Sequence, residues 1–158
     1  MTLELSYQIV KSLPQVLRIR LIRNTCYQYL TNYRKQIGLI QQIHWYFKSY
    51  RPSCRKGDYR LYIFKNQGRR PVGYGALQLH GDKLYVTECL DTDQRNQSYG
   101  KEILSVLVEI GKQEKRGLVA EIWATNERSV ALHTSSGFEL VSQRIYKGEN
   151  LLVFELKP

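Results

Sequence analysis

The stretch from Leu84 to Lys112 constrains the fold of this chain more than any other. It opens with a compact run of strand formers at 84–90, and apolar residues at i, i+3, i+4 and i+7 from Ile103 onward place one apolar stripe on a helix. The polar turn between them, 94–101, offers the unpaired N–H groups of a helix N-terminus, which suit phosphate. The alternative is an ordinary strand-to-helix connection in which a serine caps the helix.

A second segment, Asn126 to Phe138, follows a recognisable pattern: Asn, two residues, a small residue, three residues, His, three residues, then Gly-Phe. It resembles the closing motif of the GNAT superfamily of acyl-CoA N-acyltransferases, which usually has Tyr in place of that His. Residues 95–100 resemble the coenzyme loop of the same family, (Gln/Arg)-x-x-Gly-x-(Gly/Ala), with Arg95 first and Gly100 last. The two motifs occur in the family's order, and the resemblance covers roughly residues 59–157.

The resemblance implies an α/β fold: one domain over residues 1–158, with a mixed, mostly antiparallel sheet of about seven strands, a central splay and about four flanking helices. The residue pattern predicts the same order of elements. Arg51-Pro52-Ser53 is expected to end the second helix, and Trp45 and Phe47 of its aromatic stripe are expected in the core. The predicted strands are 3–10 (half-buried), 59–64, 72–79, 83–90, 118–125, 138–146 and 151–156, and the predicted helices run from Ser12 to about Arg23 or beyond, near 39–49, up to about Lys112, and from Asn126.

Charge and cysteine usage limit the classes of partner and compartment. The net charge of +10 favours a polyanionic partner, although a solvated basic surface is a simpler explanation than a dedicated nucleic-acid face. The three scattered cysteines form no CxxC pair and no disulfide framework, which suggests a reducing cytoplasm. The sequence has no run of about 18 apolar residues, so no membrane span is predicted, and its start is not expected to be a secretory signal. The sequence leaves monomer and homodimer open.

Acetyl-CoA is the co-substrate that the resemblance implies, with no metal. Its pantetheine arm would lie between the diverging strands Val86–Asp91 and Leu118–Thr125, where the N–H near Leu90 could polarise the thioester carbonyl. Ser98 departs from the family loop, which usually has glycine there, and a serine restricts φ. The predicted coenzyme-binding residues are Leu90, Asp91, Thr92, Arg95, Asn96, Gln97, Ser98, Tyr99, Gly100, Lys101, Asn126 and Ser129.

Two titratable residues are the candidates for proton transfer. His133 stands at the family's tyrosine, so the resemblance implies that it protonates the departing thiolate; the alternative is a helix histidine that only packs. Glu88 is the first candidate for the base that neutralises the amine, although it could equally be a paired strand carboxylate. Leu84, where several family members have their glutamate, is apolar here. Cys89 is expected to be a packed thiol, because direct transfer needs no acyl-enzyme.

These observations predict an N-acetyltransferase that moves an acetyl group from acetyl-CoA to a primary amine. Family analogy suggests a small molecule, such as an amino sugar, or a protein or peptide amine. The alternative is a non-catalytic GNAT-like module that binds acyl-CoA or nucleic acid, and Ser98 and His133 are its best support.

Overall fold

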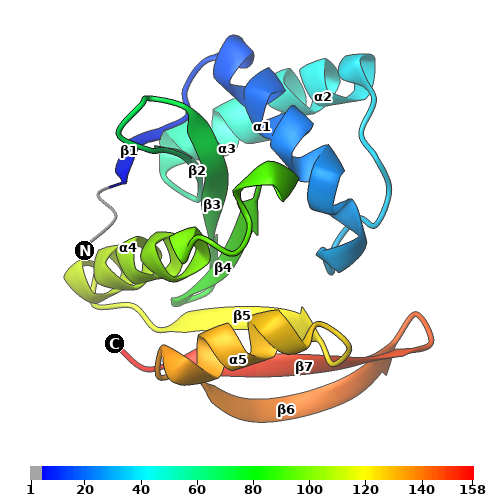
Figure 1. Ribbon diagram of the computed structural model, residues 1–158, viewed down its shortest axis with the longest axis vertical. Helices are drawn as coiled ribbons and strands as arrows, with labels where there is room; N and C mark the ends of the chain where they lie inside the picture. The colour runs from blue at the N-terminus through cyan, green and yellow to red at the C-terminus, as the bar shows by residue number, and fades with distance from the viewer. Residues whose placement is uncertain (1–4) are drawn as a thin grey trace.

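Seven strands form one mixed sheet in the order β1-β2-β3-β4-β5-β7-β6 (Figure 1). The computed structural model of the chain describes residues 5–158. All neighbouring strands are antiparallel except β4 and β5, which are parallel, so the predicted mixed, mostly antiparallel sheet is confirmed. The strands are β1 (Ser6–Ile9), β2 (Tyr59–Lys65), β3 (Pro71–His80), β4 (Lys83–Leu90), β5 (Leu118–Trp123), β6 (Glu139–Tyr146) and β7 (Glu149–Leu156).

Helices cover both faces of this sheet (Figure 1). One apolar cluster packs α1 (Leu13–Cys26) and the second helical region against β2 to β4, and the other packs α4 (Tyr99–Gln113) against the opposite face, with α5 (Glu127–Ser135) beside it. The second helical region consists of α2 (Leu39–Trp45), the π-helical turn η2 (Tyr46–Tyr50) and α3 (Arg51–Lys56), and short 3₁₀ turns are η1 (Tyr27–Tyr29) and η3 (Thr92–Gln94). None of the described helices is long and apolar enough to cross a membrane.

Several local signals in the sequence act as expected. Ser12 precedes α1, and the Gln15 side chain accepts a hydrogen bond from the Ser12 N–H at 3.1 Å. Gly137 ends α5 with φ of 90°, and Phe138 behind it is buried in the core. On β3, a Cβ at Gly75 would lie 2.8 Å from Leu107 of α4, so glycine allows this helix to approach the sheet closely.

The second helical region differs from its prediction. It does not end at Pro52 but continues to Lys56, where Gly57 caps it with φ of 82°. The π-helical turn lies directly before Pro52, and proline fits within the first turn of the α-helix that follows because its missing N–H is not needed there. Phe47 is 49% exposed, so the predicted core position is wrong, and Tyr46 and Tyr50 are buried instead.

Two further expectations were wrong. The four residues of β1 are exposed rather than half-buried, because β1 lies at the sheet edge, although Leu5 before them is half-buried and Val10 after them is buried; residues 3–4 of the prediction lie outside the described part. Cys26 and Cys89 form a disulfide that joins the end of α1 to β4, and Cys54 is free. The pair is 63 positions apart, so only the packing of α1 against β4 brings it together.

Candidate active site

The site begins where β4 and β5 diverge. Their parallel pairing covers only Leu84↔Leu118 and the next residue pair. The Leu84 N–H donates toward β5, to the Gly117 carbonyl at 2.9 Å, and alternation along β4 directs the N–H groups of Glu88 and Leu90 to the same edge. That edge has no partner strand beyond the second pair. The predicted splay is therefore present, with backbone donors along its open edge.

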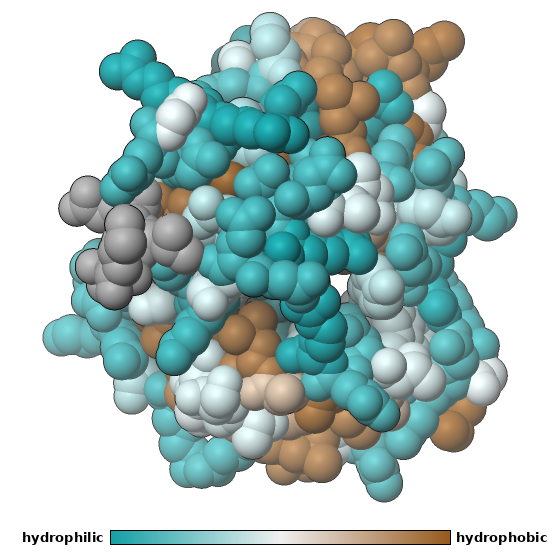
Figure 2. All heavy atoms as spheres, viewed as in Figure 1, coloured by the Kyte–Doolittle hydropathy of each residue, from teal (hydrophilic) through white to brown (hydrophobic). Residues whose placement is uncertain are grey.

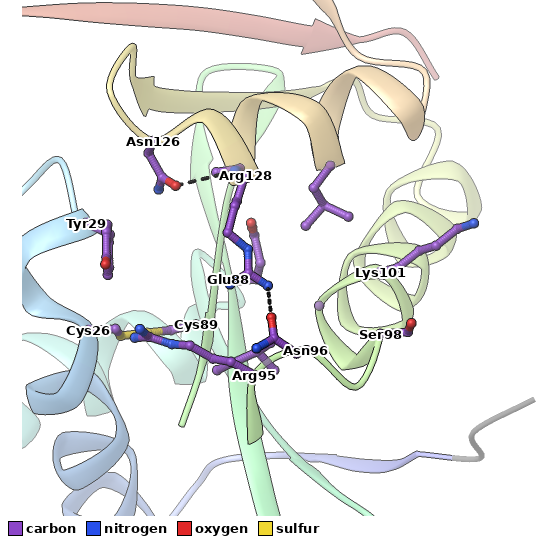
Figure 3. Close-up of a pocket in the computed structure, with 14 residues that line it drawn as sticks. Cys26, Tyr29, Glu88, Cys89, Arg95, Asn96, Ser98, Lys101, Asn126 and Arg128 are labelled. Carbon is purple, nitrogen blue, oxygen red and sulfur yellow. Dashed lines mark hydrogen bonds between the residues drawn. A yellow bond between two sulfur atoms is a disulfide. The ribbon is translucent and has the colours of Figure 1, made fainter. Parts of the chain in front are cut away.

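A cavity of about 330 Å³ lies at this open end (Figure 3). In the face shown in Figure 2, the molecule is hollowed between the upper helices and α5 below, and hydrophilic side chains border the hollow. The cavity is lined by residues of α1, η1, β4, the following loop, α4 and α5: Cys26, Tyr29, Glu88, Cys89, Leu90, Arg95, Asn96, Ser98, Gly100, Lys101, Asn126, Arg128, Ser129 and Leu132.

The loop from Arg95 to Lys101 has the backbone shape of an anion-binding turn. Asn96 and Ser98 have φ of 65° and 61°, so Ser98 adopts the left-handed conformation that glycine would adopt more easily. The N–H groups of Tyr99 and Gly100 open α4 and have no preceding helical turn to accept from them. A Cβ at Gly100 would make ordinary contacts with the Leu90 and Leu132 side chains, at 3.6 and 3.7 Å, and Gly100 itself lines the cavity beside the helix N-terminus.

Three cationic side chains surround the loop. Arg128 of α5 reaches across the cavity and donates from Nη2 to Oδ1 of Asn96 at 2.9 Å, so α5 holds the loop directly (Figure 3). The Arg95 guanidinium lies over the Tyr29 ring, 5.4 Å from its centroid. Lys101 extends from α4 away from Glu88 (Figure 3). Together they give the cavity a positive electrostatic potential suited to phosphate.

The predicted coenzyme residues fall into two groups. Four of them do not line the cavity: Asp91 and Thr92 precede the loop, Gln97 is exposed, and the Tyr99 ring is buried in the core beneath α4. Those that do line it are Leu90, Arg95, Asn96, Ser98, Gly100, Lys101, Asn126 and Ser129. The sequence reasoning missed Arg128, although it lies inside the second motif, and it missed the contributions of Cys26, Tyr29, Cys89 and Leu132, which are distant in sequence or apolar.

Glu88 and His133 face each other across the splay. His133 is 2% exposed and Glu88 12% exposed, and the His133 Nε2 lies 3.6 Å from the Glu88 Oε2. His133 Nδ1 is 2.9 Å from the Ser129 carbonyl oxygen, which can only accept a hydrogen bond, so Nδ1 carries a proton. Nε2 is therefore the nitrogen that can exchange a proton with the Glu88 side. The structure brings both predicted catalytic residues together in a small cavity of about 70 Å³.

Burial dominates the electrostatics of Glu88. It raises the pKa of this carboxyl above its ordinary value, and the His133 charge and the backbone N–H of Glu88 itself oppose the shift. A carboxyl with a raised pKa is a stronger proton acceptor once it is ionised. The pair can therefore accept a proton at one edge of the splay and donate one at the other.

Asn126 connects the two cavities described so far. Its side-chain oxygen accepts the Ser129 N–H at 3.3 Å, which caps α5. The same residue lines both the larger cavity and the small one that holds His133. Asn126 therefore both caps α5 and lines the two cavities.

A third cavity, of about 390 Å³, lies on the other side of the splay, between α1, the second helical region and β2 to β4. It shares Leu30, Asn32 and Thr87 with the small cavity, which in turn contains Glu88. The remaining residues that line it are Ile19, Arg23, Tyr33, Ile37, Gln41, Gln42, Trp45, Tyr59, Leu61, Tyr74, Ala76 and Gln78.

The fold and the site define an α/β domain in which an open helix N-terminus with cationic neighbours and a buried acid–histidine pair meet at a splayed sheet. The model of the acetyltransferase (GNAT) family matches residues 19–138, and the chain belongs to this family. The acyltransferase class predicted from the sequence is thereby confirmed. A search of curated proteins found no match to the sequence.

Solved structures of low sequence identity share the fold. A GNAT superfamily phosphinothricin acetyltransferase from Sinorhizobium meliloti, in complex with acetyl-CoA, is 19% identical with a TM-score of 0.78 and covers 99% of this chain and 89% of its own. A ribosomal-protein-alanine N-acetyltransferase from Brucella melitensis is 19% identical with a TM-score of 0.78, covering 97% and 99%. A spermidine/spermine N-acetyltransferase from Vibrio cholerae is 8% identical with a TM-score of 0.76, covering 98% and 92%. The named acceptors differ widely, so the fold does not specify the amine.

Proposed function

We propose that this protein transfers an acetyl group from acetyl-CoA directly to a primary amine. The observation that supports this proposal best is the position of the Glu88–His133 pair, which lies between a cavity suited to the coenzyme and a second cavity for an acceptor. Direct transfer needs both ligands at one point, and the splayed end of β4 borders all three cavities.

The residues of the larger cavity fit acetyl-CoA, which supplies the acetyl thioester. The N–H groups at the start of α4 and the Arg95 and Arg128 side chains would hold the pyrophosphate. Gly100 lines the cavity without a side chain, which allows a phosphate to approach the helix backbone. The Leu90 N–H, on the unpaired edge of β4, is the donor available to a carbonyl oxygen that gains negative charge.

Glu88 and His133 divide the proton transfers between them. The neutral acceptor amine attacks the thioester carbonyl, and the ionised Glu88 carboxylate takes the N–H proton that the nitrogen loses as the C–N bond forms and the C–S bond breaks. His133 holds its exchangeable proton at Nε2 and donates it to the departing sulfur, while Nδ1 stays bonded to the Ser129 carbonyl. Because the two groups lie 3.6 Å apart, the proton that Glu88 gains can restore the one that His133 loses.

Acetyl transfer is tested with acetyl-CoA, a panel of primary amines and a thiol reagent that detects released coenzyme A. The wild type should release coenzyme A only when an amine is present, and the acetylated amine should appear by mass spectrometry. Glu88→Gln and His133→Gln should each lower kcat while acetyl-CoA still raises the melting temperature. Coenzyme binding without acetylation of any amine in the panel would instead favour the non-catalytic module.

A further inference from the structure

The acceptor-side cavity of about 390 Å³ has an unusual charge distribution for a site that receives an amine. Arg23 is the only charged side chain that lines it within residues 5–158, and the remaining lining is aromatic, aliphatic or amide. A substrate with several ammonium groups would find no carboxylate here, and one of its charges would meet a guanidinium. The cavity is therefore complementary to a molecule that presents negative charge to Arg23.

Arg23 has donors to spare for such a group. It is 9% exposed, and its two terminal nitrogens donate to the backbone carbonyls of Lys35, at 2.9 Å, and Tyr33. These bonds use only two of the five guanidinium N–H donors, and Arg23 has no carboxylate partner in the described part of the chain. Burial lowers the pKa of Arg23, and neighbouring tyrosines, Tyr74 first, oppose the shift. A buried cation without a counter-ion gains most from a bound anion.

Gln42 is a second, independent sign of a missing ligand. The residue is 4% exposed on α2, lines the same cavity, and its side-chain oxygen has no hydrogen-bond partner. A buried amide without a partner costs free energy, so the amide is placed to bond to a polar group that enters the cavity.

The opposite end of the path carries the opposite charge. Tyr74 lines the cavity together with Arg23; burial raises the pKa of its phenol, and the Arg23 charge opposes the shift. Glu88 does not line this cavity itself but lies in the small cavity that shares Leu30, Asn32 and Thr87 with it. A ligand that extends from Arg23 to Glu88 therefore meets a cation at one end and a carboxylate at the other.

We propose that the acceptor is an amino acid or a close analogue, whose carboxylate binds Arg23 and whose amine points to Glu88. This inference rests on the proposed acetyl transfer and specifies its substrate class. The two charges orient a zwitterion in one direction, Gln42 bonds to a polar group of the ligand, and the aromatic walls contact its side chain. The volume of the cavity falls within the range of small-molecule sites.

Binding decides the proposal. Isothermal titration of the protein, with and without coenzyme A, would use the common amino acids, the primary amides of those that bind, and spermidine. At least one amino acid should bind, and its amide, which keeps the amine and loses the negative charge, should bind roughly tenfold more weakly or worse. Equal affinity of acid and amide, or binding of spermidine in preference to every amino acid, would overturn it.

Arg23→Gln and Arg20→Gln form a matched pair of variants. Both arginines are on α1 and both donate to carbonyls of residues 33–37, but Arg20 does not line the cavity; its Nη1 donates to the Ile37 carbonyl at 2.9 Å. Arg23→Gln should abolish the preference for acid over amide, and Arg20→Gln should retain it. If Arg23 had only a structural role, Arg23→Gln would weaken binding of the acid and of the amide equally. That result would refute the assignment of Arg23 to the ligand carboxylate.

Two further measurements keep the test decisive. If Arg23→Gln does not fold, two other variants replace it. Arg23→Lys keeps the positive charge and should retain part of the preference for the acid. Gln42→Leu removes the amide and should weaken binding of both the acid and its amide. The acetyl-CoA thermal shift is read separately in every variant. Its absence would refute the proposed transferase activity, whereas a normal shift with no preference for the carboxylate would refute only the substrate class.

Discussion

The two large cavities on either side of Glu88 differ in how the chain builds them. The coenzyme-side cavity relies on backbone donors and on three cations, Arg95, Lys101 and Arg128, which come from one loop and the helices beside it. The acceptor-side cavity relies on side chains from α1, the second helical region and three strands, with Arg23 as its one charge among the described residues. The first suits a phosphate group of any attached molecule, and the second discriminates by shape and by the position of one charge. A family of enzymes with one coenzyme and many acceptors would be expected to show this division.

The largest expected effect comes from filling the space at Gly100. Gly100→Trp should abolish the acetyl-CoA-induced rise in melting temperature, which for the wild type corresponds to roughly 2.7 kcal/mol at a hundredfold excess over Kd. The indole would occupy the space beside the helix N-terminus while leaving the acceptor-side cavity intact. Differential scanning fluorimetry with acetyl-CoA measures the loss, and titration of an amino acid measures the other cavity.

Gly100→Ala is the control for this substitution. Its Cβ would make ordinary contacts with Leu90 and Leu132, so the variant should fold and still bind acetyl-CoA. If Gly100→Trp binds acetyl-CoA like the wild type, the coenzyme does not use this cavity.

The next effect concerns Glu88, which separates the two cavities. Glu88→Gln should lower kcat by about 10²–10⁴ because the amide cannot accept the proton of the amine. In the wild type, kcat/KM should rise with pH through the raised pKa of this carboxyl, and the variant should lose that limb. Rates measured between pH 5 and 9 with one amine supply the test; a variant with an unchanged profile would assign the base elsewhere.

Glu88→Gln also gives a stability prediction of opposite sign. The folded state favours the protonated carboxyl, so the wild type loses stability as pH rises from the ordinary carboxyl value through the raised one. The glutamine side chain of the variant does not ionise, so the variant does not lose this stability. Its melting temperature at alkaline pH should exceed that of the wild type by on the order of 2–4 °C if its free energy of unfolding is higher by roughly 1 kcal/mol. Well below the ordinary carboxyl pKa the two proteins should melt alike.

Arg128 should have a smaller effect that is confined to the coenzyme side. Arg128→Gln removes a cation from the cavity and the bond that holds Asn96, so the Kd for acetyl-CoA should rise roughly tenfold, with little change in acceptor binding. Arg144 is the matched control, because it pairs with Glu121 at the surface of the sheet and lines neither cavity. If Arg144→Gln weakened acetyl-CoA binding as much as Arg128→Gln, the effect would result from net charge alone.

Sequence reasoning predicted the coenzyme side and largely missed the acceptor side. The loop from Arg95 to Lys101 and the segment after Asn126 are contiguous, so their local patterns carry the positions of their backbone donors. The element order follows from periodicity and turn signals in the same way, whereas the parallel pair at the centre was expected only from the family resemblance. His133 could be chosen because it lies in the second of these segments, and Glu88 because it lies in the strand before the loop, but their mutual approach required the fold.

The features that the sequence did not predict share one physical cause: they depend on tertiary contacts rather than on local sequence. Arg23 carries no local signal, since it is one of several arginines on α1 and only packing places it in a cavity. The helix passed Pro52 because a π-helical turn precedes it, a feature that proline rules alone do not indicate. Phe47 is exposed because the opposite face of this helical region packs inward: Ile40 shares the predicted face and is 83% exposed, whereas Gln42, Tyr46 and Tyr50 are buried.

The Cys26–Cys89 disulfide is the direct covalent link between the helix of the acceptor side and the strand of the coenzyme side. It closes a loop of 63 positions, so reduction should lower stability by up to about 4 kcal/mol in the chain-entropy view. Acetyl-CoA affinity should change by less than about threefold, because no charge is lost.

Without reductant, a thiol reagent should find one thiol per denatured chain, that of Cys54, and three after reduction. Cys54→Ser is the control: it should remove the one thiol and keep the response of the melting temperature to reductant. Three thiols before reduction would show that α1 and β4 are held together by packing alone.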